Sequence, residues 1–262
     1  MTVSRRAEAY ASPTHLMKAH VAVAADPWSP DNPGGYVNLA VAENRLLFDL
    51  LEPKLNGRRN LTAADTAYQV AQGMPSFRAE LARFLSRQRG VDVDPEHLVV
   101  LGGSNSALEA LAYALCDPGD GIVVPTPYWS GLDEDVAGRA GAVVVPAERS
   151  SADGFALTAD VVERAIEAAR GRGQALRAVA LLSPDNPTGV VYDAPTLRAV
   201  AEVVHGQGLQ LIVDEVFAGS VYDGTFVSAA TVDVVPPQRR HLVWGFAKDF
   251  GLGGFKAGVL HS

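Results

Sequence analysis

The chain has 262 residues, of which 48% are apolar and 20% are charged, a composition typical of a globular protein with a sizeable core. Its 22 Lys and Arg face 30 Asp and Glu, and the formal net charge of −8 argues against a basic surface for nucleic acid or anionic lipid. The single cysteine, Cys116, excludes an internal disulfide and a thiolate metal cluster, and it fits a reducing compartment.

No apolar run is long enough to cross a membrane, and the first residues do not lead into the apolar core of a signal peptide. The sequence therefore predicts a cytoplasmic protein without a membrane or nucleic-acid partner. The histidines form no H-E-x-x-H pair, so no metal site is expected.

The first 40 residues are predicted to form an N-terminal arm, because a stretch rich in Pro, Gly and Asn over 26–35 favours turns. Amphipathic helices are predicted over 43–55 and 74–89, where apolar side chains recur at helical spacing. Residues 41–262 show no further linker, which predicts one main domain.

From residue 98 onward, short apolar runs alternate with helical segments, the pattern of an α/β domain with a mostly parallel sheet covered on both faces. The predicted strands are 98–101, 122–125, 142–146, 178–183, 209–214 and 241–247. Helices are predicted over 106–115, near 158–170 and near 195–205. The first strand, its helix and the second strand are expected to form a βαβ unit.

Ligands of open parallel sheets bind beyond the carboxyl ends of the strands, so the residues that follow each predicted strand are candidates. Gly102, Gly103, Ser104 and Asn105 open a helix after the first strand, where backbone amides and the helix dipole favour an anion such as phosphate. A capped tight turn is the alternative interpretation.

Aromatic and amide side chains follow the next strands. Tyr128 and Trp129 come after 122–125, where they can offer a face to a planar ring or pack in the core. Asn186 stands between two prolines after 178–183, and its amide can donate and accept hydrogen bonds.

Asp214 ends an apolar strand, where a carboxylate without a cationic partner would be costly. Lys248 follows an apolar strand, and an amine in apolar surroundings can lose its proton and attack a carbonyl, although a lysine reaching solvent is the alternative. A phosphate cradle, a stacking aromatic, an amide, a buried acid and an apolar lysine together predict a site for pyridoxal 5′-phosphate.

These motifs resemble the class I and II aminotransferases, which are fold-type I enzymes that depend on pyridoxal phosphate, and most of all their 1-aminocyclopropane-1-carboxylate (ACC) synthase branch. The resemblance runs from about residue 36 to the end and is carried by segments 41–46, 72–78, 117–120, 125–135, 186–189, 214–215 and 248–251. It implies a three-layer α/β/α large domain of a pyridoxal-phosphate-dependent transferase.

The resemblance also implies roles for single residues. Lys248 would form the Schiff base with the cofactor, Asp214 would pair with the pyridine nitrogen and Asn186 with the ring oxygen. The remaining cofactor-binding positions would be Gly103, Ser104, Asn105, Tyr128 or Trp129, and Lys256. Ala42 and Glu43 would face an amino-acid substrate, while Tyr68 would reach the phosphate in a partner subunit, which implies a homodimer.

The chain departs from the family pattern at several of these positions. Phe217 stands where the family has a tyrosine that bonds the ring oxygen, and Gly245 and Ala247 replace serines. Lys256 replaces an arginine, so a bidentate phosphate clamp becomes a point charge. The sequence stops at Ser262, whereas the family continues into a small domain, so the large domain is expected to be incomplete at its C-terminal end.

Transamination of an α-amino acid is the expected reaction, with ACC-synthase-like elimination on S-adenosylmethionine as a narrower alternative suggested by segment 42–44. A truncated or degenerate homologue without catalysis is a second alternative. A serine hydrolase is the third, because Gly102-Gly-Ser104 resembles part of a nucleophile elbow and is followed by Asp214 and His241 in the order of a Ser-Asp-His triad.

Overall fold

The computed structural model describes residues 3–4, 7–8, 14–57 and 60–262. Its first three described helices are α2 (His15–Ala25), α3 (Phe48–Gly57) and α4 (Pro75–Arg89). The prediction of a helix over 74–89 is confirmed. The prediction over 43–55 is wrong at its start, because the Asn44 side chain accepts a hydrogen bond from the backbone N–H of Leu46 at 3.0 Å, and such local bonds compete with a helix.

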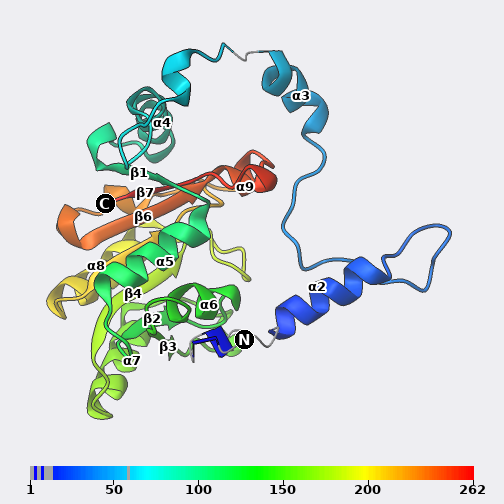
Figure 1. Cartoon of the computed structure of the whole chain (residues 1–262). Coiled ribbons are helices and arrows are strands. Elements are labelled where there is room, and N and C mark those ends of the chain that lie inside the picture. The colour runs from blue at the N-terminus through cyan, green and yellow to red at the C-terminus, as the bar shows by residue number, and fades with distance from the viewer. Residues whose placement is uncertain (1–2, 5–6, 9–13, 58–59) are drawn as a thin grey trace.

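Seven strands form one sheet in the order β1-β7-β6-β5-β4-β2-β3 (Figure 1). The strands are β1 (Leu98–Leu101), β2 (Gly121–Pro125), β3 (Val143–Ala147), β4 (Leu176–Leu182), β5 (Gln210–Asp214), β6 (Arg240–Gly245) and β7 (Gly258–His261). Among the described strands, only the pairings of β7 with β1 and β6 are antiparallel and all others are parallel, so the prediction of a mostly parallel sheet is confirmed.

One sequence prediction about the strands needs correction. The run 241–247 is too long, because residues Phe246–Asp249 form the short helix α9. The strand, helix and strand of the expected βαβ unit are present, but β4 to β7 lie between β1 and β2 in the sheet. Helix α5 (Ser104–Leu115) instead crosses the middle of the sheet, with Leu108 and Leu111 in one core cluster with Ile212 and Val243.

Helices cover both faces of the sheet. Helices α5 and α6 (Gly131–Ala137) pack on one face, and α7 (Ala159–Gly171) and α8 (Ala194–Gly206) pack on the other. Strand β2 is buried throughout, and β4, β5 and β6 are buried over most of their length. The predicted three-layer α/β/α architecture is confirmed, and no described helix is long and apolar enough to span a membrane.

A cluster of aromatic rings holds α9 in place at one end of β6. The centroid of the fully buried Trp244 ring lies 5.2 Å from that of Phe84 on α4 and 4.9 Å from that of Phe246 on α9. The Phe250 ring closes the cluster, 5.6 Å from both Phe84 and Phe246. Helix α9 carries Lys248, so this packing fixes the backbone from which the lysine projects.

Helices α2 and α3 lie away from the sheet (Figure 1), and neither contains a buried residue. The predicted domain begins at residue 41, yet α3, which lies within it, is as exposed as α2 in the predicted arm. The division into an arm over 1–40 and a domain over 41–262 therefore stays a prediction.

Candidate active site

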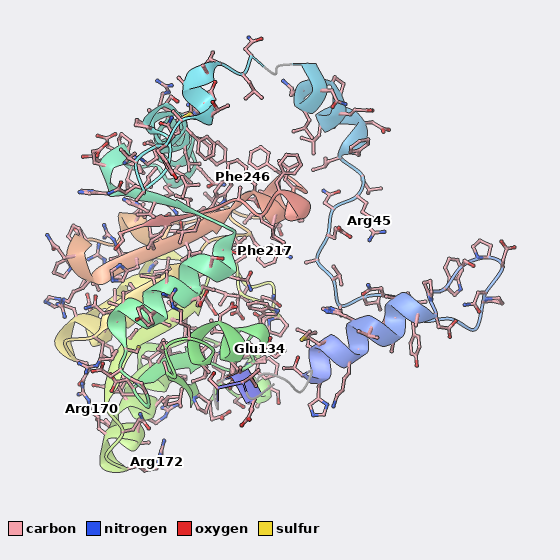
Figure 2. The ribbon with its side chains drawn as sticks, viewed as in Figure 1. Arg45, Glu134, Arg170, Arg172, Phe217 and Phe246 are labelled. Atoms are coloured by element: carbon pink, nitrogen blue, oxygen red, sulfur yellow. The ribbon has the colours of Figure 1, made fainter. Side chains whose placement is uncertain are left out.

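A cavity of about 720 Å³ opens at the carboxyl edge of the sheet. Its lining includes Ala42 and Glu43 from the segment before α3, Asn186 from the loop after β4, Phe217 from the loop after β5, and Lys248. In Figure 2 the labelled Phe217 lies close to α9, and the labelled Arg45 belongs to the segment before α3 that also lines the cavity. The structure thus brings four separate chain segments together.

Lys248 is partly buried in this cavity rather than extended into solvent. Its Nζ donates a hydrogen bond to the carbonyl oxygen of Ala42 at 2.9 Å and lies 5.9 Å from the centroid of the Phe217 ring. Burial lowers the pKa of Lys248, whereas the nearby charges of Asp214 and Glu43 raise it. A lowered pKa increases the share of neutral amine, the nucleophilic form.

Asp214 is the last residue of β5 and is 5% exposed. Its Oδ1 accepts a hydrogen bond from the backbone N–H of Val216 at 3.0 Å, and no ion pair of Asp214 occurs among the described residues. Burial raises the pKa of Asp214 to about 7, while the Val216 hydrogen bond lowers it and the charge of Glu215 raises it. The carboxylate therefore retains acceptor capacity for a protonated ring nitrogen.

The neighbouring acid, Glu215, is instead fully buried and paired within the protein. It forms an ion pair with Arg89 at 2.9 Å in which both side chains are fully buried, and it accepts hydrogen bonds from Ser228 Oγ at 2.7 Å and Ala229 N–H at 2.8 Å. The two consecutive acids thus have different tasks, and only Asp214 is available to a ligand.

The start of α5 lies against the ends of β6 and β7. Gly103 has φ of 107°, which favours glycine, and a Cβ added at Gly258 would lie 2.6 Å from the Ser104 nitrogen. A Cβ added at Gly245 would lie 3.8 Å from Ser104 Cβ. This close approach of three backbones leaves the first turn of α5 at the sheet edge, where its amide groups can bind an anion.

Asn105 and the aromatic pair have partners within the protein. Asn105 Nδ2 donates to Asp135 at 3.0 Å, and burial raises the pKa of this carboxyl to about 7. The Tyr128 hydroxyl donates to Asp133 Oδ1 at 2.9 Å, and the Trp129 indole packs so closely over the backbone of α6 that a Cβ added there, at Gly131, would clash. Neither aromatic residue lines the described cavity, so ring stacking stays a prediction.

The remaining candidates lie at the surface. Glu43 pairs with Arg45 at 2.7 Å on the cavity wall, and Lys256 is exposed with φ of 51°. Tyr68 is fully exposed and does not line the cavity, so its role at a partner subunit stays a prediction.

The hydrolase alternative fails on geometry. His241 lies at the amino end of β6, where its ring nitrogens contact Ser262 Oγ at 2.7 Å and Gln210 Oε1 at 3.1 Å. Ser104 and Asp214 lie at the carboxyl edge, so the three residues do not form a triad. Among the residues that the structure describes, no group of His, Cys, Asp or Glu could hold a metal ion.

Sequence reasoning missed two residues that hold this edge together. Asp249 accepts hydrogen bonds from Gly219 N–H at 2.8 Å, Ser220 Oγ at 2.9 Å and Trp244 Nε1 at 3.1 Å, which ties the loop of Phe217 to α9. Arg149 is fully buried and bonds the loops after β2 and β4. An arginine shortly after the apolar strand predicted over 142–146 is the sequence signal that could have found Arg149.

The residues fit pyridoxal phosphate. A buried carboxylate with spare acceptor capacity suits a protonated ring nitrogen, and a partly desolvated lysine suits its aldehyde. A Cβ added at Gly103, just before the first turn of α5, would meet no atom within 4 Å, so this side of the turn is open to a phosphate.

Comparisons with known proteins agree with this fit. A family model described as "Aminotransferase class I and II" matches residues 36–262. The chain is 36% identical to "1-aminocyclopropane-1-carboxylate synthase 1" of Oryza sativa subsp. indica, over 90% of this chain and 54% of that protein. It is 34% identical to "Probable inactive 1-aminocyclopropane-1-carboxylate synthase-like protein 2" of Mus musculus, over 100% of this chain and 48% of that protein.

Among solved structures, the chain is similar to the aspartate aminotransferase of Thermus thermophilus with maleate, with a TM-score of 0.80 and 28% identity over 100% of this chain and 65% of that one. The chain spans about half the length of the curated relatives it matches. The cofactor of this family is pyridoxal 5′-phosphate, as the sequence predicts. The chain belongs to the class I and II aminotransferases, fold-type I enzymes that depend on pyridoxal phosphate, and resembles their ACC-synthase-like branch.

Proposed function

We propose that this protein is an enzyme that transaminates an α-amino acid with pyridoxal 5′-phosphate. The observation that carries the proposal is the position of Lys248 Nζ in the cavity, with the buried acid Asp214 close enough for its charge to act on the amine. When bound, the cofactor supplies an electron sink that stabilises negative charge at the α-carbon of the substrate.

Each residue of the site would then have a separate task. Asp214 holds a proton at the ring nitrogen, and the amide of Asn186 donates to the ring oxygen. Lys248 binds the aldehyde carbon and moves the proton at the α-carbon of the substrate. Phe217 has no hydroxyl to donate, so the proposal leaves the ring oxygen to the amide of Asn186.

The phosphate would be held by the backbone amides of Gly103, Ser104 and Asn105 at the start of α5, with Lys256 as a supplementary charge. Tyr128 or Trp129 would stack on the ring. Because Lys256 is a point charge and Gly245 has no side chain, fewer charge-assisted hydrogen bonds reach the phosphate than an arginine and a serine would supply.

The proposal also includes the surroundings of the site. Ala42 and Glu43 lie on the cavity wall, where they would face the substrate. A homodimer would let the exposed Tyr68 reach the phosphate in a partner subunit. The buried free thiol of Cys116 fits a cytoplasmic location.

An absorbance spectrum tests the cofactor, and a panel of amino acids with 2-oxo-acid acceptors tests the reaction. We expect a visible band on addition of pyridoxal phosphate that disappears in Lys248→Ala. We also expect a new amino acid formed from the acceptor. A chain without the band contradicts the proposal at its first step.

Elimination on S-adenosylmethionine is the second candidate, favoured by the similarity to ACC synthases and by Glu43 on the cavity wall. Release of ACC from S-adenosylmethionine, without amino transfer to any 2-oxo acid, would select it. Cofactor binding without turnover of any substrate would instead select a non-catalytic homologue, the class to which the name of the similar mouse protein points.

A further inference from the structure

We propose that Arg149 is a positioning residue for the cofactor ring, because it fixes the spacing between the loop that carries Tyr128 and Trp129 and the loop that carries Asn186. The inference rests on the proposed function, because only a bound pyridoxal phosphate ring would contact both loops.

On one side, Arg149 binds the backbone of the loop after β2. Its Nε donates to the carbonyl oxygen of Thr126 at 2.6 Å, and its Nη2 donates to the carbonyl oxygen of Pro127 at 2.8 Å. These two acceptors directly precede Tyr128 in the chain. The contacts therefore fix the main chain from which Tyr128 and Trp129 project.

On the other side, Arg149 binds the loop after β4. Its Nη2 also donates to Asp185 Oδ2 at 3.0 Å, and its Nη1 donates to the Tyr192 hydroxyl at 2.9 Å. The Thr188 hydroxyl donates to the same Asp185 oxygen. Asp185 directly precedes Asn186, so this contact fixes the backbone next to the amide donor.

The chemistry of arginine suits this task. A guanidinium group is planar and presents its donors in a rigid fork, so the positions of its acceptors are fixed relative to one another. The Arg149 side chain is 0% exposed and that of Asp185 is 6% exposed, so solvent does not screen the pair. A lysine would keep the charge but could not reach both loops with the same geometry.

Arg78 offers a matched control. Its side chain is 5% exposed, and it donates to the carbonyl oxygens of Gly73 at 3.2 Å and Pro95 at 2.6 Å and to Glu96 at 3.1 Å. These acceptors, two carbonyls and a carboxylate, resemble the acceptors of Arg149. Arg78 joins other parts of the chain, so Arg78→Lys reports the general cost of losing a buried arginine.

The test compares dissociation constants for pyridoxal phosphate, pyridoxal and inorganic phosphate in the intact chain. In Arg149→Lys we expect the constants for pyridoxal phosphate and pyridoxal to rise together by about tenfold or more, the effect of one lost charge-assisted hydrogen bond. The constant for inorganic phosphate should stay unchanged, because Arg149 makes no contact with the start of α5. Arg78→Lys should leave all three unchanged.

A second measurement needs no cofactor. The fluorescence contributed by Trp129, obtained as the difference from the Trp129→Phe protein, should shift to longer wavelength in Arg149→Lys and stay constant in Arg78→Lys. If Arg149→Lys does not fold, Asp185→Asn replaces it, since the amide still accepts one hydrogen bond. The expected changes then have the same signs and are smaller.

Equal constants and equal Trp129 emission in the Arg149 variant and the wild type would overturn the inference alone. Equal losses in the Arg149 and Arg78 variants would reduce Arg149 to a general structural role and also overturn it. A wild-type chain that binds neither pyridoxal nor its phosphate would overturn the proposed function together with the inference.

Discussion

The charge on Lys248 depends on several neighbours with opposing effects. Burial lowers its pKa and Asp214 raises it, while the Phe217 ring, with its centroid 5.9 Å from Nζ, offers no hydrogen bond. The carbonyl oxygen of Ala42 accepts a hydrogen bond from the amine. An amine held in this way is oriented and partly desolvated before any ligand arrives.

Covalent labelling tests the assignment of Lys248. Borohydride reduction of the cofactor-loaded chain, followed by peptide mapping, should mark Lys248 because its amine is the partly buried one on the cavity wall. Lys256→Ala should leave the label in place, whereas Lys248→Ala should remove it. A label on Lys256 in the wild type would refute the assignment.

The titration of Asp214 predicts how stability depends on pH in the cofactor-free chain. Burial raises the pKa of Asp214 from 3.8 to about 7, so the folded state holds a proton that the unfolded state has already released. The free energy of unfolding should therefore fall as pH rises from 3.8 to about 7 and then level off. Asp135 titrates in the same window for the same reason.

Asp214→Asn removes this contribution. The free energy of unfolding of the variant should therefore fall less steeply with rising pH than that of the wild type. Urea unfolding at about pH 5 and about pH 8 measures the difference. Asp223→Asn, at an exposed position on the following loop, should keep the wild-type slope. An unchanged slope in the Asp214→Asn protein would contradict the raised pKa.

Single residues of the site differ in how far the sequence could predict them. Asn186, Asp214 and Lys248 stand at or shortly after the ends of apolar runs, so the rule for parallel sheets was enough to place them at one edge. Arg149 and Asp249 bind partners that are far away in the sequence, such as Thr126 and Gly219. Only folding brings these partners together, so the sequence alone does not reveal them.

At the scale of elements, strands inside the sheet were predictable because they are apolar on both faces. Strand β7 (Gly258–His261) was missed because its run is short and begins with glycine. Its place depends on antiparallel pairing with β1 and β6. The order of the strands was equally inaccessible, since an apolar run does not specify its neighbours.

Gly258→Ala tests the contact between β7 and α5. The added Cβ would lie 2.3 Å from the carbonyl carbon of Gly103 and 2.6 Å from the nitrogen of Ser104, so backbone must move. We expect a loss of about 1–3 kcal/mol in the free energy of unfolding and weaker binding of pyridoxal phosphate. Urea unfolding and cofactor titration measure both.

Gly254→Ala is the control for this substitution, because an added Cβ there meets no atom within 4 Å. It should change neither quantity. Should Gly258→Ala keep wild-type stability and affinity, the start of α5 would not depend on β7.

At the scale of the whole molecule, the described N-terminal helices contribute little to the core. Helix α2 has no buried residue, and the members of the three core clusters begin at Leu81. Deleting residues 1–40 should therefore change the free energy of unfolding by less than about 1 kcal/mol. Urea unfolding of the shortened chain measures this, and a loss of several kcal/mol would show that the arm stabilises the sheet.

The pairing of β1 with β7 also sets an order of events during synthesis. Residues 98–101 leave the ribosome early, but their described partner in the sheet, residues 258–261, emerges more than 150 residues later. Until then β1 has no paired strand, and the start of α5 lacks the Gly258 backbone against which it packs. Under the proposed function, capture of the cofactor by the nascent chain would therefore wait until β7 has been translated, however early the helices and central strands form.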